Sequence, residues 1–278
     1  EYRGYDSAGI SVFQDDNTHQ TYRTAGKVET LKSTLNGHLN GHSGIAHTRW
    51  ATHGDPSIEN AHPHSDEVGS LSVVHNGIVE NHLDLREELI SKGHKFTSNT
   101  DTETIPHLIE DLINNGDSFE DAVVKAASMI KGANSVVLMN NDHPDTIMAF
   151  KKGYAGGLIV GIGIKEVFIA SDLTAITPHC SKVVHLDDSE IAIIQPDHVI
   201  FKNLENVVIK KKINSVSNNP FASAKGKYRH FMLKEIHEQP ESIISSLRGR
   251  ISFEDLSIRL KDLTLSDEKI GEIEKIFL

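Results

Sequence analysis

HTRWATHG occupies residues 47–54, and its first four residues belong to a stretch, 44–50, in which small, β-branched and polar residues alternate. This alternation over residues 44–50, and again over 70–79, predicts two strands that carry polar side chains toward one site. Residues 51–66 between them predict a loop. Arg49 and the nearby histidines therefore lie where a strand is expected to end.

The chain that follows has the pattern of a layered domain. Apolar residues at helical spacing predict amphipathic helices over 84–92, 102–114 and 119–130, with Asp101 and Ser118 as N-caps. Strands, then helices, then more strands predict an α+β domain with a largely antiparallel sheet system. Short β-branched runs predict the later strands at 135–139, 145–151, 158–163, 166–170, 182–186, 190–195 and 198–202.

The C-terminal part changes in composition. Residues 214–227 are rich in Asn, Ser, Ala and Lys, which predicts a surface linker. Residues 228–278 return to helical periodicity, with Pro240 as an expected break. This tail is too short to form a second complete domain.

Composition excludes several classes of function. The chain has 278 residues, 38% of them hydrophobic, and a formal charge of -11. A chain of this size can bury a full core. Its negative charge argues against a nucleic-acid or anionic-membrane binder, because such proteins need a basic face. No apolar run is long enough to span a bilayer and no signal pattern opens the sequence, so a cytoplasmic location is expected. A single cysteine, Cys180, excludes an internal disulfide framework.

Five histidines within thirty positions raise the possibility of a metal site: His47, His53, His62, His64 and His75. Imidazole binds zinc well, but the spacing of these residues matches none of the known helical zinc motifs. We therefore expect satisfied or surface histidines here, with zinc ligation as the weaker alternative.

The residues alone leave several roles open. Arg49 could clamp a carboxylate through two parallel hydrogen bonds or form a structural salt bridge, and Trp50 could wall a pocket or fill the core. Asn76-Gly77 is typical of a hairpin turn, yet an amide and a backbone N–H also suit an oxyanion. Asp101 could cap a helix or bind an ammonium group.

Five strings together resemble a known family. Their order and approximate separation are similar to those of the glutaminase domain of glutamine:fructose-6-phosphate amidotransferase (isomerizing), and the resemblance continues through 228–232 and covers essentially the whole chain. The strings are EYRGYDSAG (1–9), HTRWATHG (47–54), NAHPH (60–64), HNG (75–77) and TDTE (100–103).

The resemblance implies a fold and a domain plan. The family has the N-terminal nucleophile hydrolase architecture, a four-layer αββα sandwich with largely antiparallel sheets, here with a short helical tail. Residues 1–213 would be the glutaminase domain, without its N-terminal start. Residues 214–240 would be a linker and connector, and 241–278 the incomplete helical start of the sugar-phosphate isomerase region.

The resemblance also implies how glutamine is bound. Arg49 would hold its α-carboxylate and Asp101 its α-ammonium group, while Thr52 and His53 would line the same pocket. His62 would support the pocket.

Two further roles follow from the same resemblance. Asn76 and Gly77 would form the oxyanion hole, through the side-chain amide and the backbone N–H. Trp50 would gate the channel that delivers ammonia to the sugar site.

The implied reaction hydrolyses L-glutamine and transfers its nitrogen to fructose 6-phosphate, giving glucosamine 6-phosphate for the pathway to UDP-N-acetylglucosamine. No cofactor, metal or nucleic acid is implied, and the intact enzyme is expected to be a homodimer. The family's nucleophile is an N-terminal cysteine, whereas this sequence opens on Glu1 and Cys180 lies in a predicted loop. We therefore expect negligible glutaminase activity from the chain as printed.

Two alternatives remain. One is the glutaminase of another amidotransferase, such as that which feeds phosphoribosylamine synthesis. The other is a glutamine-binding module without chemistry. The intact string over 49–54 and the connector before Pro240 favour the sugar-phosphate enzyme.

Overall fold

The computed structural model describes residues 4–35, 39–51, 54–153, 155–196, 198–216, 228–247, 251–252, 257–258, 271 and 275. The chain divides into two compact units, residues 1–223 and 224–278. Among the described residues, no helix has both the length and the apolar character that crossing a membrane requires.

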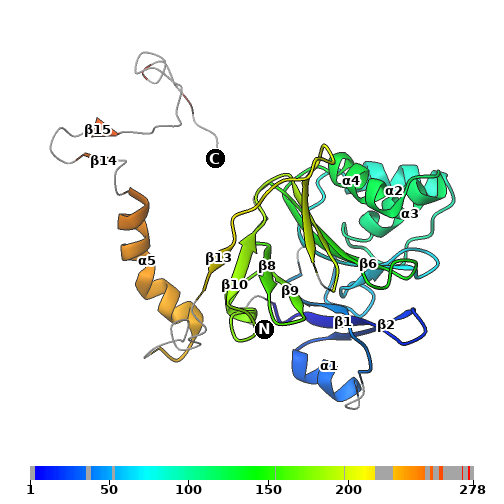
Figure 1. The fold of residues 1–278 in the computed structure, drawn as a ribbon, viewed down its shortest axis with the longest axis horizontal. Coiled ribbons are helices and arrows are strands. Elements are labelled where there is room, and N and C mark those ends of the chain that lie inside the picture. Colours follow the sequence, from blue (N-terminus) through cyan, green and yellow to red (C-terminus); the bar gives the residue numbers. More distant parts are fainter. Residues whose placement is uncertain are drawn as a thin grey trace. The chain divides into compact units, whose positions relative to one another are not determined.

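Along the chain, the first unit has strands with one helix, then three successive helices, and then mainly strands (Figure 1). Its elements are β1 (Ser7–Phe13), β2 (His19–Ala25), α1 (Val28–Thr34), β3 (Gly44–Arg49), β4 (His64–Ser65), β5 (Leu71–Gly77), α2 (His82–Ser91), α3 (Thr104–Asn114), α4 (Phe119–Met129), β6 (Asn134–Asn140), β7 (Ile147–Lys152), β8 (Ile159–Ile162), β9 (Val167–Ala170), the 3-10 helix η1 (Leu173–Ala175), β10 (Lys182–His185), β11 (Glu190–Ile194), β12 (Val199–Asn203) and β13 (Asn214–Ser215).

These strands form three sheets, and the paired strands described run antiparallel. The largest sheet has the order β12-β11-β7-β6-β5-β4, and two smaller sheets have the orders β2-β1-β3 and β13-β10-β8-β9. Because β5 and β6 pair from Leu71↔Asn140 to Gly77↔Asn134, the end of β5 is fixed in register beside the start of β6.

Side-chain alternation along β6 separates the layers. Val136 and Leu138 pack into the apolar cluster shared with α2, α3 and α4. Val137 and Met139 point the other way, into a cluster shared with β1, β3 and β8. Successive residues of a strand face opposite sides, so a strand buried on both faces must be apolar throughout. The six-stranded sheet is therefore the inner layer between helices and a second layer of strands.

The outer layers complete the sandwich. Figure 1 shows α2, α3 and α4 together on one face of the large sheet, and α1 beyond β1 and β2. A third apolar cluster, which includes Ile176 and Cys180, covers the outer face of β8 and β10. The Cys180 thiol donates a hydrogen bond to the Ile176 carbonyl at 3.3 Å, and burial raises its pKa, so it acts as a packing residue.

The predicted strands and helices of the first unit are confirmed to within a few residues, from β3 to β12. Ser118 caps α4 as predicted, because its hydroxyl accepts from the backbone N–H of Asp121. The prediction that Asp101 caps α3 is wrong: Glu103 occupies the cap position and the Asp101 side chain is bound elsewhere.

The sequence analysis missed β4, which lies in the predicted loop over 51–66, and it also missed β1, β2 and α1. The sequences of β1, β2 and α1 mix Gly, Ser, Thr and charged residues and give little period-2 or helical signal. The predicted linker is also wrong at its start, since Asn214–Ser215 forms β13 and pairs with β10. Two backbone-paired residues are too few to leave a compositional signal.

The second unit contains α5 (Phe231–Leu247), followed by β14 (Ile251–Ser252) and β15 (Ser257–Ile258), which pair antiparallel. The expected break at Pro240 is wrong, because α5 continues through it. Proline removes one helical hydrogen bond, and the turns on either side retain theirs. The tail 228–278 was predicted to be helical, and β14 and β15 contradict this at their positions. About half of that tail lies outside the described residues.

We expect Leu138→Ala to lower the free energy of unfolding by about 2–5 kcal/mol, because it opens a cavity in a strand buried on both faces. Leu138 is 0% exposed. The matched control is Leu83→Ala at the 65% exposed start of α2, which should change stability by at most about 0.5 kcal/mol. Urea unfolding of the three proteins checks this, and equal losses in both variants would contradict the assigned core.

Candidate active site

A small polar cavity of about 120 Å³ opens where β3 and β5 end. Pockets for drug-sized ligands usually measure about 300–1,000 Å³, so this one suits a compact metabolite. Its walls come from four segments that are separate in sequence: His47, Thr48, Arg49, Trp50, His62, His75, Asn76, Gly77, Thr100, Asp101 and Thr102.

Arg49 is buried at the last position of β3, with 4% of its surface exposed. Its guanidinium donates to the carbonyl of Gly54 at 3.0 Å and to that of Asp55 at 3.3 Å. Burial lowers the pKa of Arg49, while the nearby carboxylates of Asp101 and Asp6 act in the opposite direction. A guanidinium stays protonated at neutral pH, so the cavity wall carries a fixed positive charge.

Asp101 supplies the opposite charge and is also buried, at 4% exposure. Its Oδ2 atom accepts a hydrogen bond of 2.8 Å from the backbone N–H of Val79, two residues beyond β5. This contact ties the segment before α3 to the end of β5. The carboxylate is thereby oriented at the cavity and is unavailable as a helix cap.

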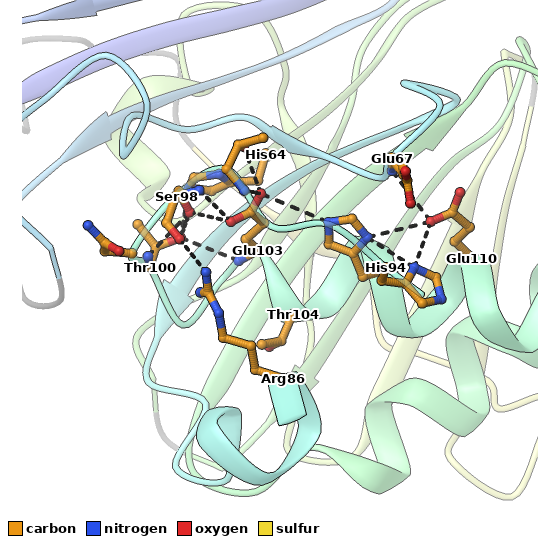
Figure 2. Close-up of polar contacts among 12 residues, drawn as sticks. His64, Glu67, Arg86, His94, Ser98, Thr100, Glu103, Thr104 and Glu110 are labelled. Atoms are coloured by element: carbon orange, nitrogen blue, oxygen red, sulfur yellow. Dashed lines mark hydrogen bonds and ion pairs between the residues drawn. The ribbon is translucent and has the colours of Figure 1, made fainter. Parts of the chain in front are cut away.

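Glu103 holds the segment that carries Asp101. Its two carboxylate oxygens accept from the backbone N–H groups of Thr97 and Ser98 and from both hydroxyls, at 2.7–2.8 Å (Figure 2). Burial acts to raise the pKa of Glu103, but hydrogen bonds from His107, Thr97 and Ser98 outweigh it and bring the pKa well below its ordinary range. The ionised carboxylate fixes the loop through charge-assisted hydrogen bonds.

Asn76-Gly77 is not a hairpin turn. Both residues are the last of β5 and still pair with Ser135 and Asn134 of β6. Gly77 has φ +133°, and a Cβ there would lie 2.1 Å from the Ala133 carbonyl oxygen, so only glycine fits. Asn76 Oδ1 lies 3.0 Å from His47 Nε2, which assigns its amide Nδ2 as the donor beside the cavity.

The histidines form a connected stack along the cavity. The rings of His47 and His62 are stacked with centroids 4.3 Å apart, and His62 meets His64 edge-on at 4.9 Å. His75 Nδ1 lies 2.9 Å from Thr102 Oγ1 and its Nε2 lies 2.9 Å from Asn134 Oδ1. Both ring nitrogens of His75 are thus hydrogen-bonded to protein, whereas the Nδ1 atom of His47 is buried without a hydrogen-bond partner among the described residues.

Burial is the main cause of the low basicity of this stack. It lowers the pKa of His47 to about 4 and brings the pKa of His62 well below its ordinary value. The pKa of His64 and that of His75 are lowered by burial as well. At neutral pH the imidazoles are therefore neutral, and Arg49 is the positive group at the cavity.

Of the remaining candidates, the structure describes Trp50. It lines the cavity but is 55% exposed, and its ring lies edge-on to Tyr5 with centroids 5.6 Å apart. Thr52 and His53 fall outside the described residues. The sequence analysis did not predict that Thr48, Thr100 and Thr102 line the cavity, although the last two belong to the TDTE string.

Comparisons with known proteins agree with this architecture. The family model of the glutamine amidotransferase domain matches residues 47–178. Among solved structures, the glutamine phosphoribosylpyrophosphate (PRPP) amidotransferase from B. subtilis, complexed with ADP and GMP, has a TM-score of 0.61 at 23% identity, over 74% of this chain and 45% of that one. At this identity the likeness shows the fold alone.

Curated relatives are much closer in sequence. The glutamine–fructose-6-phosphate aminotransferase (isomerizing) of Clostridium tetani (strain Massachusetts / E88) is 44% identical over 279 residues, covering 100% of this chain and 45% of the relative. The protein of the same name from Aquifex aeolicus (strain VF5) is 45% identical over 264 residues, covering 94% of this chain and 44% of the relative.

The fold and the matched domain place the chain among the glutamine amidotransferases, with the predicted α+β N-terminal nucleophile hydrolase sandwich. Within that class, it is similar to the glutamine–fructose-6-phosphate aminotransferases along all or nearly all of its length. The resemblance predicted from the sequence is thus confirmed. The chain spans about 45% of the length of the curated relatives it matches.

The buried histidines make stability depend on pH. Their folded-state pKa values are lowered, so the unfolded chain binds more protons below pH 6.5 and stability is lost as the pH falls from 7 to 5. Each fully neutral histidine contributes at most about 2 kcal/mol of this loss. Denaturant unfolding at both pH values measures it.

His64→Gln removes one of these groups and should flatten that pH dependence relative to the parent chain. His185→Gln replaces an exposed histidine of β10 and should leave it unchanged. The assignment fails if the parent chain is equally stable at pH 7 and pH 5.

Proposed function

We propose that this chain forms the glutamine-binding site of a glutaminase, and that the whole enzyme uses the released ammonia to convert fructose 6-phosphate to glucosamine 6-phosphate. One observation carries this proposal: Arg49 and Asp101, of opposite charge, are both buried on the wall of one small cavity. An amino acid presents the complementary pair, an α-carboxylate and an α-ammonium group.

Arg49 and Asp101 are positioned to bind the α-carboxylate and the α-ammonium group separately. The backbone carbonyls of Gly54 and Asp55 hold the Arg49 guanidinium, whose planar fork of five donors suits a carboxylate. Asp101 binds Val79 through Oδ2, and we assign its Oδ1 to the α-ammonium group. Thr52 and His53 are proposed to complete the wall, and His62 supports it through its stack on His47.

The amide end of glutamine would meet Asn76 and Gly77. The Asn76 amide, oriented by His47, and the backbone N–H of Gly77 are proposed to stabilise the oxyanion that forms when the amide carbon is attacked. Gly77 also allows close approach, because its position tolerates no side chain. Trp50, exposed at the cavity edge, is proposed as the gate for ammonia.

The attacking group follows from the family resemblance alone. In that family a cysteine thiolate attacks the amide carbon, ammonia leaves with a proton from the α-amine, and water then hydrolyses the thioester to glutamate. Cys180 is excluded from this role, because it packs against Ile176 and is not among the cavity residues. The predicted domain boundaries, homodimer and cytoplasmic location remain predictions.

The relatives favour one of two candidate acceptors for the nitrogen, fructose 6-phosphate and PRPP. Identity of 44% over the whole chain supports fructose 6-phosphate. The PRPP amidotransferase structure, at 23%, supports only the shared fold. The name printed for the curated relatives describes the transfer of glutamine nitrogen to a sugar phosphate, and we extend it to the enzyme that contains this chain.

Calorimetric titration with L-glutamine tests the site. We expect saturable binding by the chain and a loss of about 30-fold or more in Arg49→Ala, because removing one partner of a buried charged hydrogen bond costs roughly 2–5 kcal/mol. Asp101→Asn should weaken L-glutamine binding by a similar factor. Asp84→Asn, on the exposed surface of α2, is the matched control and should bind normally.

A second ligand shows whether Asp101→Asn loses recognition of the ammonium group or loses its folded site. Glutaramic acid is glutamine without its α-ammonium group, so Asp101→Asn should bind it as well as the parent chain does. Equal losses for both ligands would mean that Asp101 acts only on the fold. The proposal is overturned if glutamine does not bind, or if it binds Arg49→Ala unchanged.

A further inference from the structure

A second group of titratable side chains lies apart from the cavity, between the α2–α3 loop and α3. His94 belongs to the loop, whereas His107 and Glu110 are on consecutive turns of α3. Within the described part of the chain, these three form the group of His, Cys, Asp and Glu residues whose ligand atoms all lie within 4.8 Å of one another. They are not among the histidines that the sequence analysis weighed as metal ligands.

Three atoms of this group converge on a common point, as Figure 2 shows for His94 and Glu110. His94 Nδ1 is 3.2 Å from His107 Nδ1 and 3.2 Å from Glu110 Oε2, and His107 Nδ1 is 3.5 Å from the same oxygen. Tetrahedral zinc with bonds of about 2.0–2.1 Å separates its ligand atoms by about 3.3–3.4 Å. The triangle therefore has the dimensions of one face of a zinc tetrahedron.

The opposite ring nitrogens face carboxylates. His107 Nε2 lies 3.9 Å from Glu103 Oε1, and His94 Nε2 lies 3.9 Å from Asp111 Oδ1. Histidines that bind metals usually direct their second nitrogen, as N–H, toward a carboxylate or carbonyl, which fixes the tautomer and leaves a lone pair for the metal. Both histidines have this arrangement.

The tautomer decides whether the triangle needs a cation, because the 3.2 Å contact between the two Nδ1 atoms also has hydrogen-bond geometry when one of them is protonated. With a proton on each Nε2, both Nδ1 atoms carry lone pairs, which face each other and the Glu110 carboxylate. A hydrogen-bonded pair would instead need a proton on at least one Nδ1. A cation at the centre satisfies all three atoms together.

Burial is consistent with a bound ion. The side chain of His107 is 1% exposed, and those of His94 and Glu110 are 9% and 11% exposed. The group is mostly enclosed, but His94 and Glu110 keep a small exposed surface toward solvent. Two imidazoles and one carboxylate form a donor set that zinc favours over calcium or magnesium.

We propose that His94 Nδ1, His107 Nδ1 and Glu110 Oε2 bind a zinc ion, with water in the fourth position. The ion cross-links the α2–α3 loop to α3. Because His107 also faces Glu103, whose carboxylate holds Thr97 and Ser98, the cross-link stabilises the segment that carries Asp101 to the cavity. The site is independent of whether glutamine is the substrate.

Metal analysis of the chain tests this directly. After saturation with ZnCl2 and exhaustive dialysis, inductively coupled plasma mass spectrometry should find one equivalent more zinc in the parent chain than in His94→Gln or in Glu110→Gln. The matched controls, His185→Gln and Glu87→Gln, replace exposed residues and should retain the full amount. Zinc should also raise the Tm by several degrees, and this shift should vanish in His94→Gln.

Each result has a defined meaning. Failure of the dialysed parent chain to retain zinc overturns the proposal. Retention that is lost in His62→Gln but kept in His94→Gln also overturns it, because the ion would then sit at the cavity histidines. A His94→Gln chain with the parent's circular dichroism but one equivalent less zinc supports it.

Discussion

The antiparallel ladder between β5 and β6 is the constraint on which the site depends. It holds the last three residues of β5 in register with the start of β6, and it is buried between helices on one side and strands on the other. A one-residue shift in register would turn every side chain to the other face, and both faces are enclosed here. The positions of His75, Asn76 and Gly77 at the cavity follow from this pairing.

Two further sets of hydrogen bonds fix the positions of the charged groups at the cavity. Asp101 is tied to the end of β5 through the Val79 N–H, and Arg49 is tied to backbone carbonyls of the loop after β3. Arg49 and Asp101 are both buried on the wall of one cavity, and buried charged groups cluster at functional sites. A zwitterionic ligand presents the two opposite charges that such a pair would bind.

Burial disfavours the charged form of both the histidines and Glu103, but only Glu103 stays ionised. For His62 nothing nearby compensates for lost solvation, so its pKa falls well below its ordinary value. Glu103 is also buried, but donors from Thr97, Ser98 and His107 stabilise its charged form. The same carboxylate thus joins the cavity loop to the His94 and His107 group, and links the two sites through one segment of chain.

The sequence by itself determined the α+β class, the strands β3 and β5 to β12, the three helices between them and the family resemblance, because these depend on local periodicity and on short strings. It identified Arg49, Asn76, Gly77 and Asp101 as site candidates but left each with two roles. Only the tertiary structure decided that Asn76-Gly77 ends a strand and that Asp101 binds Val79 instead of capping α3. It alone brought His94 to within 3.2 Å of His107. These outcomes depend on contacts between residues far apart in the chain, and such contacts leave no period or spacing in the sequence.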